Sequence, residues 1–272
     1  MWDPALYRQF AGERSRPFYE LAARIGAVDP GFVADIGCGP GGLTAGLCRR
    51  WPGAEVVGVD SSAEMIAEAR RLTPDEADGE SAARLRFEHQ DARDWKPGRP
   101  VGVIVSNALL QWIPDHEVLL TRWAGWLADD GWLAVQLPGN HDEPTHALLR
   151  ELAGSPRWRQ LLAGVSFNRQ AADPAVYLDL LATAGCAVDA WETTYLHVLT
   201  GADAVLRWVS GTGLRPVFAA LHGADRDEFM AEYGERLRAA YPSRSYGTLF
   251  PFRRVFIVAR AGGGPAQGPA LP

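Results

Sequence analysis

The chain has 272 residues, of which 47% are hydrophobic and 22% are charged, so it can bury a sizeable core. Its net charge of -6, with no basic run, disfavours a nucleic acid as the main partner, because phosphate binding needs a basic surface. Three cysteines (Cys38, Cys48 and Cys186) are too few and too scattered for a disulfide framework or a zinc site. We find no signal-like or membrane-spanning apolar segment and therefore expect a cytoplasmic protein without a membrane partner.

Short apolar segments alternate with amphipathic segments in the first half of the sequence. This alternation predicts parallel strands joined by helices, which right-handed crossovers place on both faces of a sheet. We expect an α/β fold with a doubly wound, mostly parallel sheet and a ligand site beyond the carboxyl ends of the strands. In chain order, the predicted elements are helices at 4–10 and 16–25, a strand at 32–36, a helix at 41–51, a strand at 54–60, a helix at 61–72 opened by the capping box SSAE (61–64), strands at 84–91 and 101–107, a helix at 115–127 and a strand at 132–138.

The pattern changes after the fifth predicted strand. Residues 139–172 contain helical patterns and turn signals but no strand, and a helix follows at 173–184. Two more strands are predicted at 186–199 and 253–260, with helical sequence between them. Two late strands separated by about fifty helical residues indicate an insertion that covers one end of the sheet.

The predicted organisation is one domain over residues 1–263. Its sheet has seven strands, and a helical cap is inserted at about 139–172 and 200–250. The glycine- and proline-rich residues 264–272 are expected to form a disordered tail.

A glycine-rich turn follows the first predicted strand, in the sequence VADIGCGPGG (33–42). Such a turn at a helix N-terminus offers unpaired N–H groups and a positive dipole end to an anionic group of a ligand. Gly37, Gly39 and Gly42 match the G-x-G-x-x-G pattern of NAD sites. Asp35, however, would repel a pyrophosphate at the turn, whereas it would favour the ammonium and sulfonium groups of S-adenosylmethionine (SAM). The turn therefore favours SAM over NAD.

Two further acids end predicted strands at the same edge of the sheet. Asp60 is placed to accept hydrogen bonds from ribose hydroxyls, which both cofactors carry. Asp91 is a candidate acceptor for the adenine amino group, with the N–H of Ala92 directed at a ring nitrogen. Met65, one turn into the helix after Asp60, is placed to lie against the adenine. Core packing is the alternative for Met65, and a turn or helix cap is the alternative for Asp91.

The motif DIGCGPG (35–41), followed by Asp60 and Asp91, resembles the class I SAM-dependent methyltransferases. Further segments across nearly the whole chain are similar, more narrowly, to the trans-aconitate methyltransferases, among them NALLQWIPDH (107–116) and TGLRP (212–216). The resemblance implies SAM as the methyl donor, S-adenosylhomocysteine as its product, and trans-aconitate or a related polycarboxylate as the acceptor. It also implies a seven-stranded sheet whose last strand is antiparallel.

The residue patterns and this resemblance together nominate the residues of the site. Arginines in the cap are the natural partners of a polycarboxylate, because the planar guanidinium binds a carboxylate through two hydrogen bonds. Arg14 and Arg16 precede the first strand, and Arg16 is the candidate for the SAM carboxylate. The predicted cofactor residues are Arg16, Asp35, Gly37, Gly39, Gly41, Asp60, Ser61, Met65, Asp91, Ala92, Asn107, Gln111 and Trp112, and the predicted acceptor residues are Tyr195, His197, Trp208, Arg215 and Arg254.

The reaction that the resemblance implies needs no general base. A carboxylate has a pKa of about 4 and is already the nucleophile at neutral pH, so catalysis rests on holding the reactants in line and excluding water. Accordingly, we predict no acid–base residue, no catalytic cysteine and no metal site, since the histidines are scattered. We expect a monomer or a weak homodimer.

Three alternatives stay open at this point. Ten tryptophans are compatible with an O-, N- or C-methyltransferase that accepts an apolar natural product. An NAD(P)-dependent oxidoreductase is disfavoured by Asp35 and Asp91. A SAM-binding regulator without enzymatic activity would need a partner surface, which the sequence does not reveal.

Overall fold

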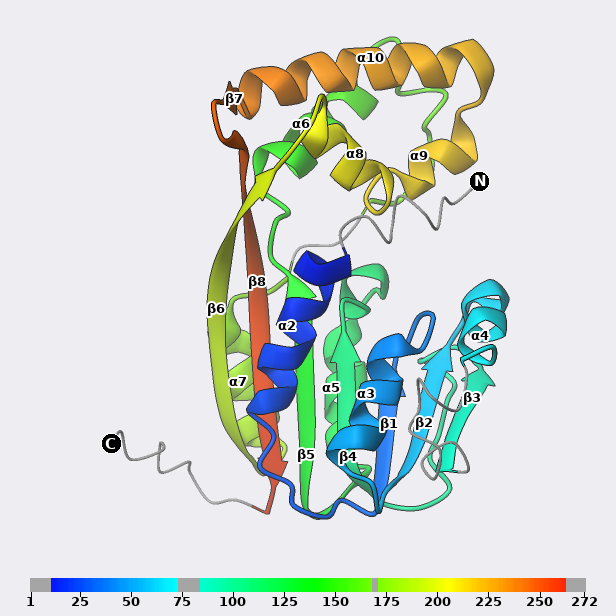
Figure 1. Ribbon diagram of the computed structural model, residues 1–272, viewed down its shortest axis with the longest axis vertical. Helices are drawn as coiled ribbons and strands as arrows, with labels where there is room; N and C mark the ends of the chain where they lie inside the picture. Colours follow the sequence, from blue (N-terminus) through cyan, green and yellow to red (C-terminus); the bar gives the residue numbers. More distant parts are fainter. Residues whose placement is uncertain (1–10, 73–83, 168–170, 263–272) are drawn as a thin grey trace. The chain divides into compact units, whose positions relative to one another are not determined.

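The computed structural model describes residues 11–72, 84–167 and 171–262 (Figure 1). The predicted helix at 4–10 and the predicted tail at 264–272 lie outside these residues, as does the side chain of Arg14. Cys38, Cys48 and Cys186 are buried and free. No helix in the described ranges has both the length and the apolar character of a membrane span.

Seven strands form one continuous sheet, in the order β3-β2-β1-β4-β5-β8-β6, and the short β7 pairs with β8. The pairs β1–β2, β1–β4, β2–β3 and β4–β5 are parallel, and β8 runs against its neighbours in Figure 1. This is the mostly parallel sheet with an antiparallel strand that the sequence predicts. The strands are β1 (Phe32–Ile36), β2 (Glu55–Asp60), β3 (Leu85–His89), β4 (Val101–Asn107), β5 (Leu127–Pro138), β6 (Cys186–Leu199), β7 (Ser243–Arg244) and β8 (Gly247–Ala261).

Two strands begin earlier than predicted. β5 starts at Leu127 rather than at residue 132, because a register shift between Val101 and Val103 of β4 accommodates the polar sequence Asp129-Asp130. Because that sequence is typical of a turn, the pattern places the start of the strand after it. β8 starts at Gly247 rather than at residue 253, and its early residues pair with β7.

Helices cover both faces of the sheet, as predicted. In Figure 1, α2 and α3 lie in front of it, and α5 and α7 lie behind it. Every residue of β1 is buried, which explains its uninterrupted apolar sequence. These elements are α2 (Ala11–Ala23), α3 (Gly42–Arg50), α4 (Ala63–Ala69), the 3-10 helix η2 (Leu110–Trp112), α5 (His116–Ala124) and α7 (Pro174–Thr183).

The chain divides into two compact units. The sheet unit comprises Ser15–Leu137, Ala172–Glu192 and Val255–Pro272, and it contains every predicted cofactor residue. The helical unit comprises Met1–Arg14, Pro138–Ala171 and Thr193–Arg254, and it contains every predicted acceptor residue. Its helices are α6 (Pro144–Ala153), α8 (Ala204–Ser210), α9 (Arg215–Ala220) and α10 (Gly223–Ala240).

The helical unit has an apolar core of its own. Trp158, Trp208 and Phe229 are almost completely buried in one cluster with leucines of α6 and α10. Trp158 and Phe229 meet edge to face, with ring centroids 5.3 Å apart. This core explains why the sequence after β5 carries helical periodicity with large aromatic residues.

In the sheet unit, a buried hydrogen-bonded pair joins α5 to α7. The Tyr177 hydroxyl lies 2.8 Å from Nε2 of His116 and accepts a hydrogen bond from the N–H of Ala172 at 3.0 Å. Burial raises the pKa of Tyr177 to about 12, and its hydroxyl shares a further hydrogen bond with the imidazole. The pair fixes the start of α5, and α5 follows the turn that carries Gln111 and Trp112.

We predict that Tyr177→Phe lowers the free energy of unfolding by about 1–3 kcal/mol, because it leaves the Ala172 N–H and the His116 ring nitrogen without their buried partner. Urea unfolding measures this loss. Tyr19→Phe is the control, since Tyr19 is exposed, and it should change stability by less than about 0.5 kcal/mol. Equal stability of Tyr177→Phe and the unchanged protein would show that this pair does not fasten α5 to α7.

Candidate active site

The glycine turn between β1 and α3 requires glycine at three positions. Gly37, Gly39 and Gly41 have φ angles of 84°, 56° and 82°, a region that other residues seldom adopt. A Cβ on Gly41 would also lie 2.6 Å from the ring of Phe87 on β3. At Gly39, by contrast, an added Cβ would meet nothing within 4 Å. The turn is therefore packed on one side and open at Gly39.

Hydrogen bonds fasten this turn to the end of β2. The carbonyl of Val59 accepts the N–H groups of Gly37 at 2.7 Å and of Cys38 at 3.0 Å. The N–H of Gly39 donates to Oδ2 of Asp60 at 3.0 Å. The backbone of the turn and the Asp60 carboxylate thus form one rigid structure.

The Asp60 carboxylate is held at both oxygens. Its Oδ1 accepts the N–H of Ser62 at 2.8 Å, while Oδ2 accepts from Gly39. Each carboxylate oxygen can accept a second hydrogen bond. The oriented carboxylate therefore keeps acceptor capacity for a pair of ligand hydroxyls, as the ribose prediction requires.

The helix cap near Asp60 differs from the prediction by one residue. Ser62, rather than Ser61, is the N-cap of α4, and its hydroxyl accepts the N–H of Met65 at 3.3 Å. The reason is that Asp60 takes the Ser62 N–H, which places the first turn one residue later. Ser61 is exposed, and its carbonyl accepts a hydrogen bond from Nε2 of His89 at 3.0 Å. Met65 is half-buried, which fits neither full core packing nor full exposure.

Asp35 lies beneath the turn and is only 2% exposed. The Thr44 hydroxyl of α3 donates to its Oδ2 at 2.6 Å. Burial raises the pKa of Asp35 to about 7; the Thr44 hydrogen bond opposes this increase, and the negative charge of Asp60 adds to it. At neutral pH the Asp35 carboxyl group is thus only partly ionised. A cation that approaches it lowers its pKa again, so the group ionises further and attracts the cation more strongly.

Asp91 caps the turn that follows it, which is the alternative that the sequence left open for this residue. Its Oδ1 accepts the backbone N–H of Arg93 at 2.8 Å and the Nε at 2.9 Å, and Oδ2 accepts Nη2 at 2.6 Å. The hydrogen bond from Arg93 is the main reason why the pKa of Asp91 lies below its usual value. One lone pair of Oδ2 remains available for an adenine amino group. The neighbouring Ala92 is buried and, among the described residues, its N–H donates to no backbone carbonyl.

The turn after β4 holds two buried amide oxygens. Within the described part of the chain, Oδ1 of Asn107 and Oε1 of Gln111 have no hydrogen-bond partner, while Nε2 of Gln111 donates to the carbonyl of Ala108 at 2.7 Å. Ala108 itself has a φ of 56°, a strained value for a residue with a side chain. Trp112, next to Gln111, is 40% exposed. A buried acceptor without a donor is costly, so this turn suits a ligand that donates hydrogen bonds.

Arg16 lies on α2, one helical turn from an acidic partner. Its Nε forms an ion pair with Oε1 of Glu20 at 2.7 Å, one helical turn along α2, and its side chain is largely exposed. A role for Arg16 at the SAM carboxylate stays a prediction.

Four of the five predicted acceptor residues come together within the helical unit. Arg254 is 4% exposed, and its guanidinium carbon lies 6.0 Å from the ring centroid of Tyr195. The rings of Tyr195 and His197 are stacked 6.0 Å apart, and His197 lies 5.0 Å from Trp208. Arg215 is separate from this group: it begins α9 and is exposed.

Comparison with known proteins places the chain in a family. A family model described as a methyltransferase domain matches residues 33–131. The chain is 51% identical over 261 residues to trans-aconitate 2-methyltransferase of Streptomyces avermitilis, which covers 95% of this chain and 96% of the relative. It is 46% identical over 271 residues to the protein of the same name from Mycobacterium tuberculosis, with 98% and 100% covered. The chain belongs to the trans-aconitate 2-methyltransferase family.

Solved structures of lower identity share the fold of this family member. The YcgJ protein of Bacillus subtilis matches with a TM-score of 0.55 at 16% identity, over 91% of this chain and 100% of that one. Phosphoethanolamine N-methyltransferase 2 of Haemonchus contortus, solved with S-adenosylhomocysteine, matches with a TM-score of 0.55 at 17% identity, over 92% of this chain and 53% of that one. Family membership supports an enzyme of the transferase class, against the oxidoreductase and regulator alternatives.

The sequence does not reveal several contacts that shape this site. Thr44 is the partner of Asp35, and its only sequence signal is a polar residue on the buried face of α3. Arg93 secures Asp91, and the Asp-x-Arg spacing is the signal that could have indicated it. Both contacts depend on side-chain directions, which periodicity does not specify.

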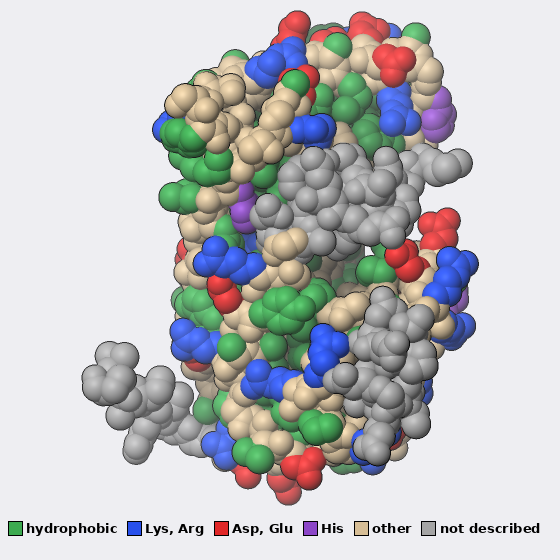
Figure 2. Space-filling view, viewed as in Figure 1, with side chains coloured by type: hydrophobic (Ala, Val, Ile, Leu, Met, Phe, Trp, Pro, Cys, Tyr) green, Lys and Arg blue, Asp and Glu red, His purple; other side chains and the backbone are tan. Residues whose placement is uncertain are grey.

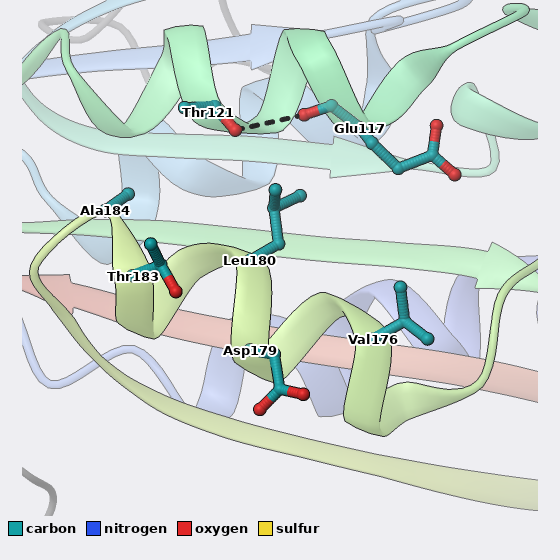
Figure 3. A pocket seen from close by; sticks show the side chains of 7 residues that line it. All are labelled: Glu117, Thr121, Val176, Asp179, Leu180, Thr183 and Ala184. Atoms are coloured by element: carbon teal, nitrogen blue, oxygen red, sulfur yellow. Dashed lines mark hydrogen bonds between the residues drawn. The ribbon is translucent and has the colours of Figure 1, made fainter.

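Outside these residues, a groove of about 420 Å³ lies between α5 and α7 and contains none of the predicted site residues (Figure 3). Leu180 of α7 points across it towards α5, where the Thr121 hydroxyl donates to the carbonyl of Glu117 at 3.2 Å. On the face drawn in Figure 2, positive and negative side chains of the described residues are interspersed.

We predict that Asp35 makes stability depend on pH between about 4 and 7, because its pKa rises from 3.8 in the unfolded chain to about 7 in the folded one. In that window the unfolded carboxyl is ionised while the folded one keeps its proton, so stability falls as pH rises, by about 4 kcal/mol at most, and is level above the window.

The measurement is urea unfolding of the wild-type protein and Asp35→Asn across this pH range. The stability of the wild type relative to the variant should decrease towards pH 7, and the other titrating groups cancel in this difference. A difference that is constant with pH would mean that the Asp35 carboxyl titrates at its ordinary value.

Proposed function

We propose that the chain transfers the methyl group of SAM to a carboxylate of trans-aconitate, which yields the methyl ester and S-adenosylhomocysteine. The observation that carries this proposal is the similarity to trans-aconitate 2-methyltransferases over nearly the whole length of both chains, at 46% to 51% identity. Because the similarity includes the helical unit as well as the glycine turn, it supports the acceptor in addition to the cofactor.

The residues of the sheet unit fit the cofactor group by group. Asp60 would receive the ribose hydroxyls, since both of its oxygens are oriented by backbone N–H groups and keep acceptor capacity. The buried amide oxygens of Asn107 and Gln111 suit the ammonium group, which is the donor of the cofactor's amino-acid end. For the adenine, Met65 would lie against the ring and Ala92 would donate to it.

When bound, SAM supplies an electrophilic methyl group on a sulfonium. The work left to the protein is positioning, because an acceptor carboxylate is ionised at neutral pH and needs no base. The rigid glycine turn and the held Asp60 fix the donor end, and partial ionisation of Asp35 adds attraction for the positive charge without exposing an anion to the acceptor.

On the acceptor side, Arg254 is the strongest candidate of the helical unit. It is buried against aromatic rings, with its guanidinium carbon 4.6 Å from the ring centroid of Phe252, so a carboxylate there would meet a charge that water does not screen. Tyr195 and His197 lie on the same side of this cluster as hydrogen-bonding groups. Arg215 would act only from the surface of α9.

A second acceptor class is favoured by one observation. Trp208 lies within 5.7 Å of the rings of both Phe250 and Phe252, so the surroundings of Arg254 are strongly aromatic. An apolar or aromatic natural product with an O-, N- or C-methyl acceptor is therefore the rival substrate. Cytoplasmic location, the monomeric or weakly dimeric state and the absence of a nucleic-acid partner stay predictions from the sequence.

We predict that the purified protein converts trans-aconitate and SAM to a methyl ester and that the single-turnover rate is nearly constant from about pH 6.5 to 8.5. Both substrates must be saturating, so that the titration of Asp35 does not change the fraction of protein that has SAM and trans-aconitate bound. Mass spectrometry identifies the ester, and rapid quenching gives the rate.

A phenol acceptor is the matched comparison, since a phenol must lose a proton before it attacks. The phenol rate should therefore rise with pH. If the rate with trans-aconitate also rose steeply, with a pKa near about 8–10, that would contradict a carboxylate nucleophile and favour the rival acceptor class.

A further inference from the structure

We propose that Asn140, Arg150 and Arg253 of the helical unit form a carboxylate-binding subsite, which takes a carboxylate of the acceptor that is not methylated. We call these three residues the Asn140 subsite. The inference rests on the proposed function, because it assigns a part of the same polycarboxylate substrate. It does not involve any of the predicted acceptor residues.

Two arginines donate to the backbone on either side of Asn140 in the chain. Arg253 donates from Nη1 to the carbonyl of Gly139 at 3.1 Å, and Arg150 donates from Nη1 to the carbonyl of His141 at 2.7 Å. Asn140 lies between these two carbonyls in the chain. Both guanidinium groups are thus held by backbone carbonyls of the residues next to Asn140 in the chain.

The amide of Asn140 is oriented with its donor end unused. Its Oδ1 accepts the backbone N–H of Arg253 at 2.7 Å. The carbonyl of Arg253 in turn accepts the N–H of Gly139 at 2.9 Å, so both backbone groups of Arg253 bond to this segment. The side chain is 3% exposed, and among the described residues its Nδ2 has no hydrogen-bond partner. A buried donor without an acceptor costs free energy, so the site is set up to receive an anionic or polar oxygen.

The local charges favour an anion. Asp142 lies 3.9 Å from Nη2 of Arg150, beyond hydrogen-bond range, and is 75% exposed at its side chain, so it neutralises that guanidinium only weakly. His146, two turns of chain away from Asn140, has a pKa lowered to about 4, first by burial and then by the positive charges of Arg150 and His141. The positive charge of Arg150 thus acts on groups near Asn140.

A carboxylate is the ligand that this combination recognises. Arg150 uses one of its five donors on the His141 carbonyl, and its planar group keeps donors for a carboxylate. The amide donor of Asn140 supplies a neutral third contact at a buried position. For a tricarboxylate acceptor, such a subsite would set which acids bind as well as how tightly.

The variant Asn140→Asp tests the subsite with the least structural change. It keeps an oxygen for the Arg253 N–H and replaces only the donor Nδ2 with an anionic oxygen, which repels a carboxylate. Arg150→Gln is the second variant. Arg236→Gln is its control, because the two arginine side chains are equally accessible (33% and 32%), both belong to the helical unit, and Arg236 is neutralised by Glu151 at 2.8 Å.

Calorimetry would measure trans-aconitate binding to the full-length protein saturated with S-adenosylhomocysteine. We expect about a tenfold or greater loss of trans-aconitate affinity for Asn140→Asp and Arg150→Gln, less than about a twofold change for Arg236→Gln, and unchanged S-adenosylhomocysteine affinity in all three. Trans-aconitate affinities within about twofold of the wild type in both test variants would overturn the subsite and leave Asn140 as a structural amide with a bound water.

The outcome for the subsite is separate from that for the proposed function. If the wild type binds trans-aconitate in an Asn140-dependent manner but forms no methyl ester, the subsite stands and the assigned reaction fails. If the ester forms and binding is indifferent to Asn140 and Arg150, the reaction stands and the subsite is overturned. A wild type that binds no trans-aconitate overturns the subsite as well.

Discussion

The carboxylate of Asp60 is the interaction on which the rest of the site depends. It accepts the N–H of Gly39 at 3.0 Å and that of Ser62 at 2.8 Å, and so joins the turn after β1 to the start of α4. An anion fixed by backbone donors needs no side-chain rearrangement before a ligand binds, which reduces the entropic cost of binding. It also places the α4 cap at Ser62. One residue thereby links the turn to the start of the helix, and its oriented carboxylate is the group that we propose for the ribose.

Each unit also buries an ionisable side chain, and the two units stabilise it in different ways. In the sheet unit, Asp35 answers burial by holding its proton to about pH 7. An arginine cannot lose its charge in this way, so in the helical unit the nearly buried Arg254 lies against aromatic rings. Near Asn140, the cations are anchored on backbone carbonyls instead. Polar groups that are oriented but not fully used are the features of this fold that are hardest to explain without ligands.

Much of the fold could be predicted from the sequence, because the signals are local. Alternating apolar segments mark the strands, and only glycine fits the φ angles at Gly37 and Gly41. The position of a candidate site residue was predictable where a strand ends, as at Asp60 of β2. It was not predictable where a side chain meets a distant partner: Thr44 on Asp35, or Asn140 on the Arg253 backbone, 113 positions away. Such contacts depend on tertiary packing, which a periodic pattern does not encode.

The central claim, that Asp60 binds the ribose of the methyl donor, is tested most directly by a calorimetric cycle. S-adenosylhomocysteine and its 2′-deoxy analogue are titrated into the wild type and into Asp60→Ala. The wild type should prefer the hydroxylated ligand by about tenfold or more, and the variant should lose that preference, because a direct hydrogen bond to a charged group disappears from both sides of the cycle. If the variant kept the full preference, whatever its overall affinity, Asp60 would not contact the ribose and the assignment of the cofactor site would be wrong.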